Sequence, residues 1–83
     1  MKTVQIHVPE ALLLQPGSTL GAVEKRSQFL LALKYFELGE LSSGQAAEMC
    51  GMSRVVFLTE ASRLGVPVAD LSPEEMDSEF SHA

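Results

Sequence analysis

Residues 41–65 read LSSGQAAEMCGMSRVVFLTEASRLG, a stretch typical of two short helices folded around one glycine. Ser42 and Gln45 form an S-x-x-Q capping box, which satisfies two amide groups at the start of a helix. Gly51 permits a sharp turn because a positive φ costs glycine little. Ser53 then provides an N-cap for the second helix. The spacing of these signals predicts a helix-turn-helix.

The second helix of this unit has a recognisable apolar face. Phe57, Ala61 and Leu64 recur at i, i+4 and i+7 and are expected to point inward. The other positions are expected to point outward: Arg54, Val55, Leu58, Thr59 and Ser62. The alternative is an ordinary αα-hairpin in which the same residues only pack.

The outward residues suit contacts with DNA, because the second helix of such a unit places its first residues at base edges. An arginine suits guanine or phosphate, hydroxyls suit several bases, and valine suits a thymine methyl group. Polar groups at the start of the first helix suit phosphate. The predicted DNA-binding residues are Ser43, Gln45, Ser53, Arg54, Val55, Thr59 and Ser62.

The flanking segments predict a helix and two short strands. Residues 2–8 alternate apolar and polar, as a half-buried strand does, and Pro9 ends the pattern. Residues 9–14 suit one helical turn, and Ser18 or Thr19 caps a long helix that ends near Leu38. Residues 66–68 predict a second short strand that pairs with residues 3–8, within one chain or between two chains.

Within the long helix, residues 29–36 are apolar on nearly every side, with Lys34 the only polar residue. A helix that covers a single core needs only an apolar stripe. The sequence therefore predicts burial on a second side, either by a partner subunit in a homodimer or by the N-terminal strand and turn.

Charge divides the chain into two parts. The chain carries 11 acidic and 6 basic residues, for a net charge of −5, and the excess of acids lies wholly after residue 69. We therefore predict a neutral helix-turn-helix domain at residues 1–70 and an acidic partner-binding tail at residues 71–83.

The sequence of the tail predicts a short amphipathic helix. Ser72 and Glu75 form a second capping box, and Met76 and Phe80 share one face. Two apolar side chains do not offset the cost of ordering such a short helix. We therefore expect the tail to fold on a basic partner surface, with Met76 and Phe80 as anchors and Glu74 and Glu75 among its acidic contacts. The alternative is that the two apolar side chains pack on the chain's own core.

The sequence shows no catalytic constellation. His7 and His82 lie near opposite ends of the chain and have no Cys or carboxylate at metal-ligand spacing. Cys50 is the single cysteine and is expected to behave as a small buried hydrophobe. We expect no enzyme activity, no cofactor and no metal. No apolar run approaches the length of a membrane span, so a cytoplasmic location is expected.

Several segments resemble a known family: ALKYFELGELS at residues 32–42, QAAE at 45–48, GMSR at 51–54, and Phe57-Leu58. They are similar to an uncharacterised prokaryotic family of short helix-turn-helix proteins. Its members are proposed to be type II antitoxins, often encoded beside PIN-domain ribonuclease toxins. The resemblance covers nearly the whole chain and implies a dimeric, DNA-binding antitoxin that also binds a toxin. Family members often carry an aromatic residue where Val55 stands and a leucine where Glu60 stands.

The expected fold is mainly α: a helix-turn-helix domain with a short N-terminal β-strand and a second short strand after the hairpin. The expected function is an antitoxin-type transcriptional regulator that acts as a homodimer and binds double-stranded operator DNA and a cognate toxin, which is expected to be a ribonuclease. The alternatives are a protein-interaction module without DNA binding and a stand-alone repressor without a toxin.

Overall fold

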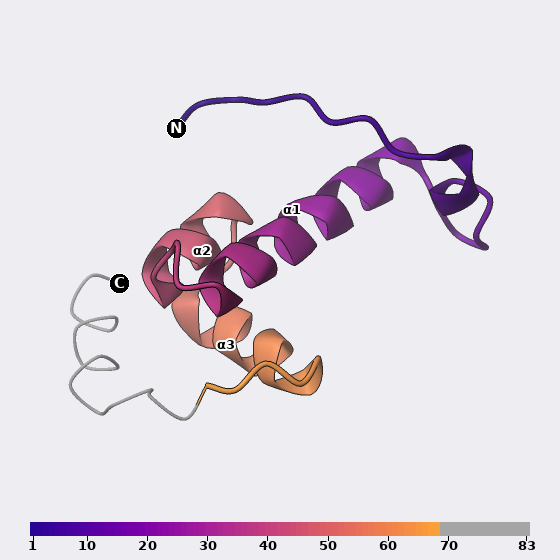
Figure 1. Ribbon diagram of the computed structural model, residues 1–83. Helices are drawn as coiled ribbons and strands as arrows, with labels where there is room; N and C mark the ends of the chain where they lie inside the picture. The colour runs from indigo at the N-terminus through magenta and orange to yellow at the C-terminus, as the bar shows by residue number, and fades with distance from the viewer. Residues whose placement is uncertain (69–83) are drawn as a thin grey trace.

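The computed structural model describes residues 1–68, which form one short 3-10 helix and three α-helices. The 3-10 helix η1 spans Glu10–Leu12, and the α-helices are α1 (Leu20–Glu37), α2 (Ser43–Met49) and α3 (Arg54–Arg63). Figure 1 shows α2 and α3 gathered against one end of α1, while the other end of α1 projects away from them.

Local capping explains where the α-helices begin. The side chain of Thr19 accepts a hydrogen bond from the amide of Ala22 at the start of α1. At the start of α2, Ser42 and Gln45 form both halves of the predicted capping box. The predicted long helix, the first helix of the hairpin and the Ser53-capped second helix are therefore confirmed.

The turn between α2 and α3 depends on Gly51. Its φ is +69°, a backbone conformation that an L-residue with a Cβ adopts only at a cost. The amide of Gly51 donates to the carbonyl of Glu48, and the amide of Met52 donates to the carbonyl of Ala47. These bonds close α2, and the chain then reverses into α3.

The core lies where the three α-helices meet. Phe57 of α3 is fully buried, and its ring makes edge contacts with Phe29 and Phe36 of α1 at centroid distances of 5.9 and 5.5 Å. Such aromatic pairs contribute about 0.5–1.5 kcal/mol each beyond the area they bury. Small side chains complete the centre and let α2 approach closely: Ala32, Ala46, Ala47 and Ala61.

The two predicted strands are wrong: among residues 1–68 there is no β-strand. Residues 1–9, called the N-terminal arm below, form no helix, and residues 1–8 make no backbone hydrogen bond within the described chain. Val66 is instead buried in the core, and its amide donates to the carbonyl of Ala61. The alternating pattern of residues 2–8 therefore lacks the neighbouring strand that a ladder requires.

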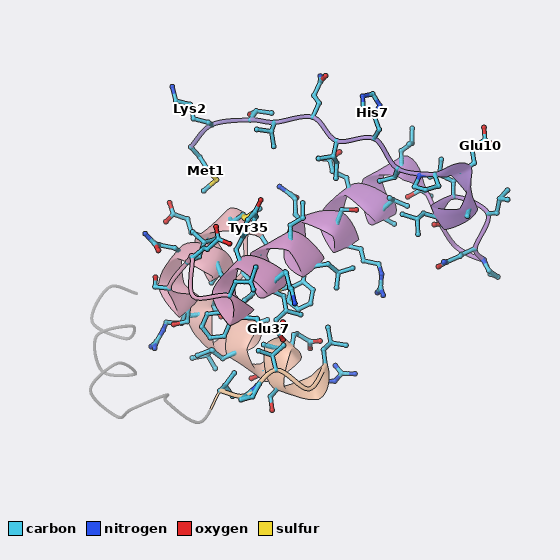
Figure 2. The ribbon with its side chains drawn as sticks, viewed as in Figure 1. Met1, Lys2, His7, Glu10, Tyr35 and Glu37 are labelled. Carbon is cyan, nitrogen blue, oxygen red and sulfur yellow. The ribbon has the colours of Figure 1, made fainter. Side chains whose placement is uncertain are left out.

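The N-terminal arm leaves much of α1 uncovered. Val4 and Ile6 of the arm are 80% and 53% exposed, and Lys2 and His7 project from the arm away from α1 (Figure 2). In the apolar stretch of α1, Phe29, Ala32, Leu33 and Phe36 pack in or against the core. On its other sides Leu30, Leu31 and Tyr35 stay 36–40% exposed.

Candidate nucleic-acid interface

An exposed stripe runs along α3. Val55, Thr59 and Ser62 lie at i, i+4 and i+7, so they share one side of the helix, and all three are exposed. We call these three residues the reading stripe. All were predicted to point outward, and the structure places them so. Val56, which sequence reasoning missed, is 49% exposed on the neighbouring side of α3.

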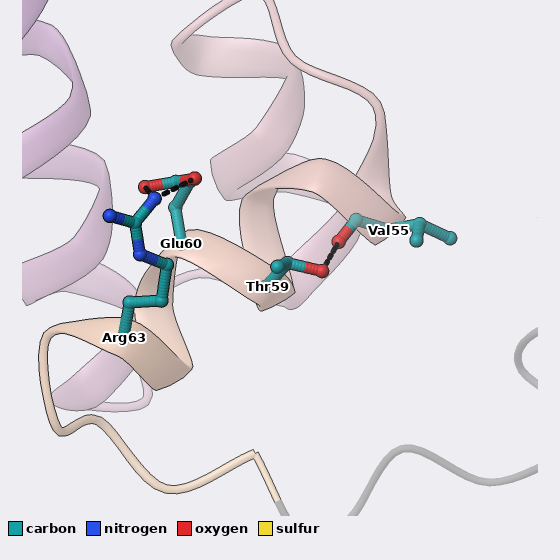
Figure 3. A network of polar contacts seen from close by, with 4 residues as sticks. All are labelled: Val55, Thr59, Glu60 and Arg63. Atoms are coloured by element: carbon teal, nitrogen blue, oxygen red, sulfur yellow. Dashed lines mark hydrogen bonds and ion pairs between the residues drawn. The ribbon is translucent and has the colours of Figure 1, made fainter.

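The hydroxyl of Thr59 already has a partner on the reading stripe. Its Oγ1 donates a hydrogen bond to the backbone carbonyl of Val55 over 2.8 Å (Figure 3). The bond holds the side chain in one orientation, yet the oxygen retains a lone pair that can accept from a base or a phosphate-bound water.

Arg54 does not lie at the exposed surface where base contact was predicted. The residue is only 8% exposed, and its Nε donates a 2.7 Å hydrogen bond to Oγ of Ser43. Because Ser43 begins α2 and Arg54 begins α3, this bond joins the starts of the two helices. Two predicted DNA contacts are thus partners of each other, and both help to set the geometry of the hairpin.

The remaining predicted polar contacts are N-terminal caps. The Oε1 atom of Gln45 accepts from the amide of Ser42 at 2.9 Å, and Oγ of Ser42 accepts from the amide of Gln45 at 3.1 Å. Oγ of Ser53 accepts from the amide of Val56 at 3.2 Å. Gln45 and Ser53 are exposed, so each is surface-accessible while it stabilises a helix start.

The inward face of α3 differs from the predicted one at Leu58 and Leu64, in addition to Arg54. Leu58 was expected to point outward but is 4% exposed, and Leu64 was expected to point inward but is 55% exposed. The buried face consists of Arg54, Phe57, Leu58 and Ala61, which have the i, i+3, i+4, i+7 spacing of a helix packed on two neighbours. Leu64 lies past the last helical residue, at the C-cap, where the helical spacing no longer applies.

Charges on α3 lie to one side of the reading stripe. Nη1 of Arg63 lies 3.0 Å from Oε1 of Glu60, and Figure 3 shows this pair on the side of α3 that faces α1, apart from Val55 and Thr59. The reading stripe itself carries no charge. It therefore suits hydrogen bonds and apolar contacts with base edges more than general attraction to phosphate.

Cys50 is a half-buried thiol at the end of α2. Its Sγ lies 3.3 Å from the carbonyl oxygen of Ala46 and donates to it. Burial raises the pKa of the thiol above its usual value of 9.0, so the neutral form prevails near neutral pH. A thiol in this state is a poor nucleophile. In the described part of the chain, no group of His, Cys, Asp and Glu is arranged to hold a metal ion.

The predicted partner-binding residues Glu74, Glu75, Met76 and Phe80 lie outside the described residues. No helix within residues 1–68 is long and apolar enough to cross a membrane.

Within residues 1–68 the fold is thus a set of three α-helices in which α2 and α3 form a helix-turn-helix pair. The chain belongs to the family described as "Uncharacterised protein family (UPF0175)", which matches residues 1–83. A UPF0175 protein of Aeropyrum pernix is 37% identical over 82 residues, which cover 99% of this chain and 86% of the relative. No solved structure matches the chain.

Proposed function

We propose that the protein is an antitoxin-type transcriptional regulator of the cytoplasm, which binds operator DNA through α3 and a cognate toxin through its acidic tail. The observation that supports DNA binding is the way in which α3 is held against the rest of the fold. Its inner face is buried, its start is joined to α2 by Arg54 and Ser43, and its reading stripe is exposed.

The reading stripe supplies the chemistry of direct readout. Thr59 and Ser62 offer hydroxyls that hydrogen-bond to base edges, and Val55 offers a methyl surface for thymine. Residues 1–69 contain six acidic and six basic side chains, so nonspecific attraction to phosphate is weak. The proposal therefore assigns specificity to α3 and expects a shallow dependence of affinity on salt, since each phosphate contact contributes a slope of about 0.9.

Two copies of the chain fit this proposal better than one. A dimer with two-fold symmetry presents two α3 helices to two operator half-sites about one DNA turn apart. The exposed apolar side chains of α1, Leu30, Leu31 and Tyr35 among them, supply surface for such contact.

The toxin part of the proposal rests on the acidic tail and on the family resemblance. Residues 71–83 carry Glu74, Glu75, Asp77 and Glu79 around Met76 and Phe80. This composition suits a basic surface with an apolar groove, as the RNA-binding face of a ribonuclease provides. Deletion of residues 72–83 is expected to abolish toxin binding, to leave DNA binding intact and to lower the melting temperature only slightly. A large fall in melting temperature would assign the tail to the fold instead.

DNA binding is tested with the promoter of the protein's own gene in a fluorescence anisotropy titration. Thr59→Val removes a hydroxyl from the reading stripe, and Thr3→Val makes the same change on the exposed N-terminal arm as a matched control. We expect Thr59→Val to weaken promoter binding by about 1–3 kcal/mol at one base position and the control to bind like the unaltered protein. Equal promoter affinity of the two variants would show that α3 does not contact the bases of the operator.

The alternative function is a protein-interaction module without DNA binding. The exposed Val55 and Val56, 37% and 49% accessible, are the observation that favours it, because apolar neighbours on a surface helix suit protein contact. Toxin binding without binding to any promoter fragment would select this alternative. Promoter binding without a toxin partner in the native host would select a stand-alone repressor.

A further inference from the structure

A surface hollow lies between α1 and α3, and we call its apolar lining residues the floor. Phe29 and Leu30 of α1, Met52 of the turn and Leu64 after α3 contribute to its lining. Phe29 also touches Phe57 in the core, so the floor continues into the interior. Leu30 and Leu64 are 40% and 55% exposed. We call this feature the α1–α3 hollow.

The charged lining residues of the α1–α3 hollow, which we call its rim, carry a net positive charge. Lys25 and Arg26 line it from α1, and Glu60 and Arg63 line it from α3. Glu60 pairs with Arg63 at 3.0 Å, which leaves the two charges of Lys25 and Arg26 without an ion pair in the described part of the chain. The hollow thus combines apolar surface with excess positive charge, whereas residues 1–69 as a whole are neutral.

We propose that the α1–α3 hollow is the docking site of the chain's own acidic segment, residues 70–80, in the toxin-free protein. That segment carries Asp70, Glu74, Glu75, Asp77 and Glu79, which complement the charges of Lys25 and Arg26. Met76 and Phe80 stand four residues apart and supply two apolar side chains for the floor.

The attachment of the segment favours its own chain as the source. Val66 is buried and its amide is bonded to Ala61, so the acidic segment starts four residues after a fixed point. Leu64, part of the hollow, lies only six residues before Asp70. A short tether of this kind gives an effective concentration in the millimolar range, which favours docking within one chain over capture of a free peptide.

Docking of this segment gives the protein a regulatory contact. The same Met76 and Phe80 are the anchors assigned to the toxin under the proposed function, on which this consequence rests. Toxin and hollow then compete for one segment, and toxin binding exposes Lys25 and Arg26. The docking itself is tested without toxin or DNA, so its failure and the failure of the proposed function are distinguishable.

The first experiment uses a carbodiimide, which joins an amine to a carboxylate that touches it, on the full-length protein. We expect mass spectrometry to find cross-links from Lys25 to the carboxylates of residues 70–79. Lys34, whose Nζ lies 2.7 Å from Glu37, is the internal control and should link to Glu37. High salt should reduce the Lys25 links because it screens exposed charges. A mixture of isotope-labelled and unlabelled chains separates links within one chain from links between copies, and links between copies would overturn the proposal.

The second experiment compares amide NMR spectra of the full-length protein and two tail variants. Met76→Ala/Phe80→Ala removes the two apolar anchors, while Ser78→Ala/Ser81→Ala changes the same tail without removing an apolar group. We expect the first variant to shift the amide signals of Leu30, Met52 and Leu64 and to lose the Lys25 cross-links. The control should retain both. Unshifted hollow signals in the first variant, or cross-links spread evenly over Lys2, Lys25 and Lys34, would overturn the proposal.

Discussion

Nε of Arg54 donates a hydrogen bond to Oγ of Ser43 over 2.7 Å, and so joins the first residue of α3 to the first residue of α2. The two residues are eleven positions apart, on either side of the Gly51 turn. Because Arg54 is 8% exposed, the bond is shielded from water. The angle between the two helices therefore depends on this polar contact as well as on apolar packing.

We predict energetic coupling between these two residues. Arg54→Ala and Ser43→Ala should each lower the free energy of unfolding, and the double variant should lose less than the sum of the two. The interaction energy should be about 0.5–3 kcal/mol, the range for residues in direct contact. Urea denaturation of the four proteins in one buffer provides the measurement, and strictly additive losses would show that the bond contributes nothing.

A second prediction concerns two glycines in the hairpin. Gly51→Ala should destabilise the protein by about 1–2 kcal/mol, because its φ of +69° is costly for any residue with a Cβ. An added Cβ meets no atom within 4 Å there, so the cost comes from the backbone alone. Gly44→Ala is the matched control within α2.

The control should change stability in the opposite direction. An added Cβ at Gly44 meets only Oγ of Ser42, at 4.0 Å, which is ordinary contact. Alanine there should stabilise the protein by about 0.4–1 kcal/mol, because it restricts the unfolded chain. Thermal denaturation of both variants tests the pair, and destabilisation of equal size would contradict the assigned role of Gly51.

A third prediction concerns the pH dependence that Cys50 confers. Burial raises the pKa of the folded thiol above the 9.0 of an exposed one, so the unfolded chain loses its proton first as the pH rises. The contribution of Cys50 to stability is therefore complete below the unfolded value and declines as the pH rises through the folded pKa. Denaturation midpoints from pH 7 to pH 10 should fall more steeply for the unaltered protein than for Cys50→Ala, and parallel curves would contradict the shift.

A fourth prediction is that the protein is a homodimer in solution. Leu30, Leu31 and Tyr35 lie close together in sequence on α1 and are partly exposed. Neighbouring exposed apolar side chains of this size indicate a surface that contacts another protein. Light scattering at micromolar concentration should give twice the 9.0 kDa mass of one chain. A monomer mass throughout the concentration range would rule out the two-copy arrangement.

The helix boundaries were predictable because the signals that set them are local. Thr19, Ser42 and Ser53 each accept a hydrogen bond from an amide three residues later, and such contacts are encoded within one turn. The absence of a strand at residues 2–8 was not predictable in the same way. Alternation describes one strand, whereas a ladder also needs a partner, and Val66 is buried in the core instead.

In the candidate site, too, local features were predictable from the sequence and features that depend on distant contacts were not. The outward direction of Val55, Thr59 and Ser62 followed from helical spacing. The burial of Arg54 and Leu58 did not, because it depends on how closely α2 approaches α3. The small side chains of Ala46 and Ala47, which are 0% and 3% exposed, permit an approach that widens the buried face of α3.

The projecting end of α1 has a fixed length, and this length bears on the spacing of two copies on DNA. The core uses residues from Phe29 onward, so the nine residues from Leu20 to Gln28 extend away from the hairpin (Figure 1), over about 13 Å at 1.5 Å per residue. If two copies pair along α1 through its exposed side chains, the length of α1 helps to set the distance between their α3 helices. Removing one helical turn from α1 would then shorten the projecting segment of each copy by about 5.4 Å. The preferred operator would change to a closer half-site spacing, and the base preference of each half-site would stay unchanged.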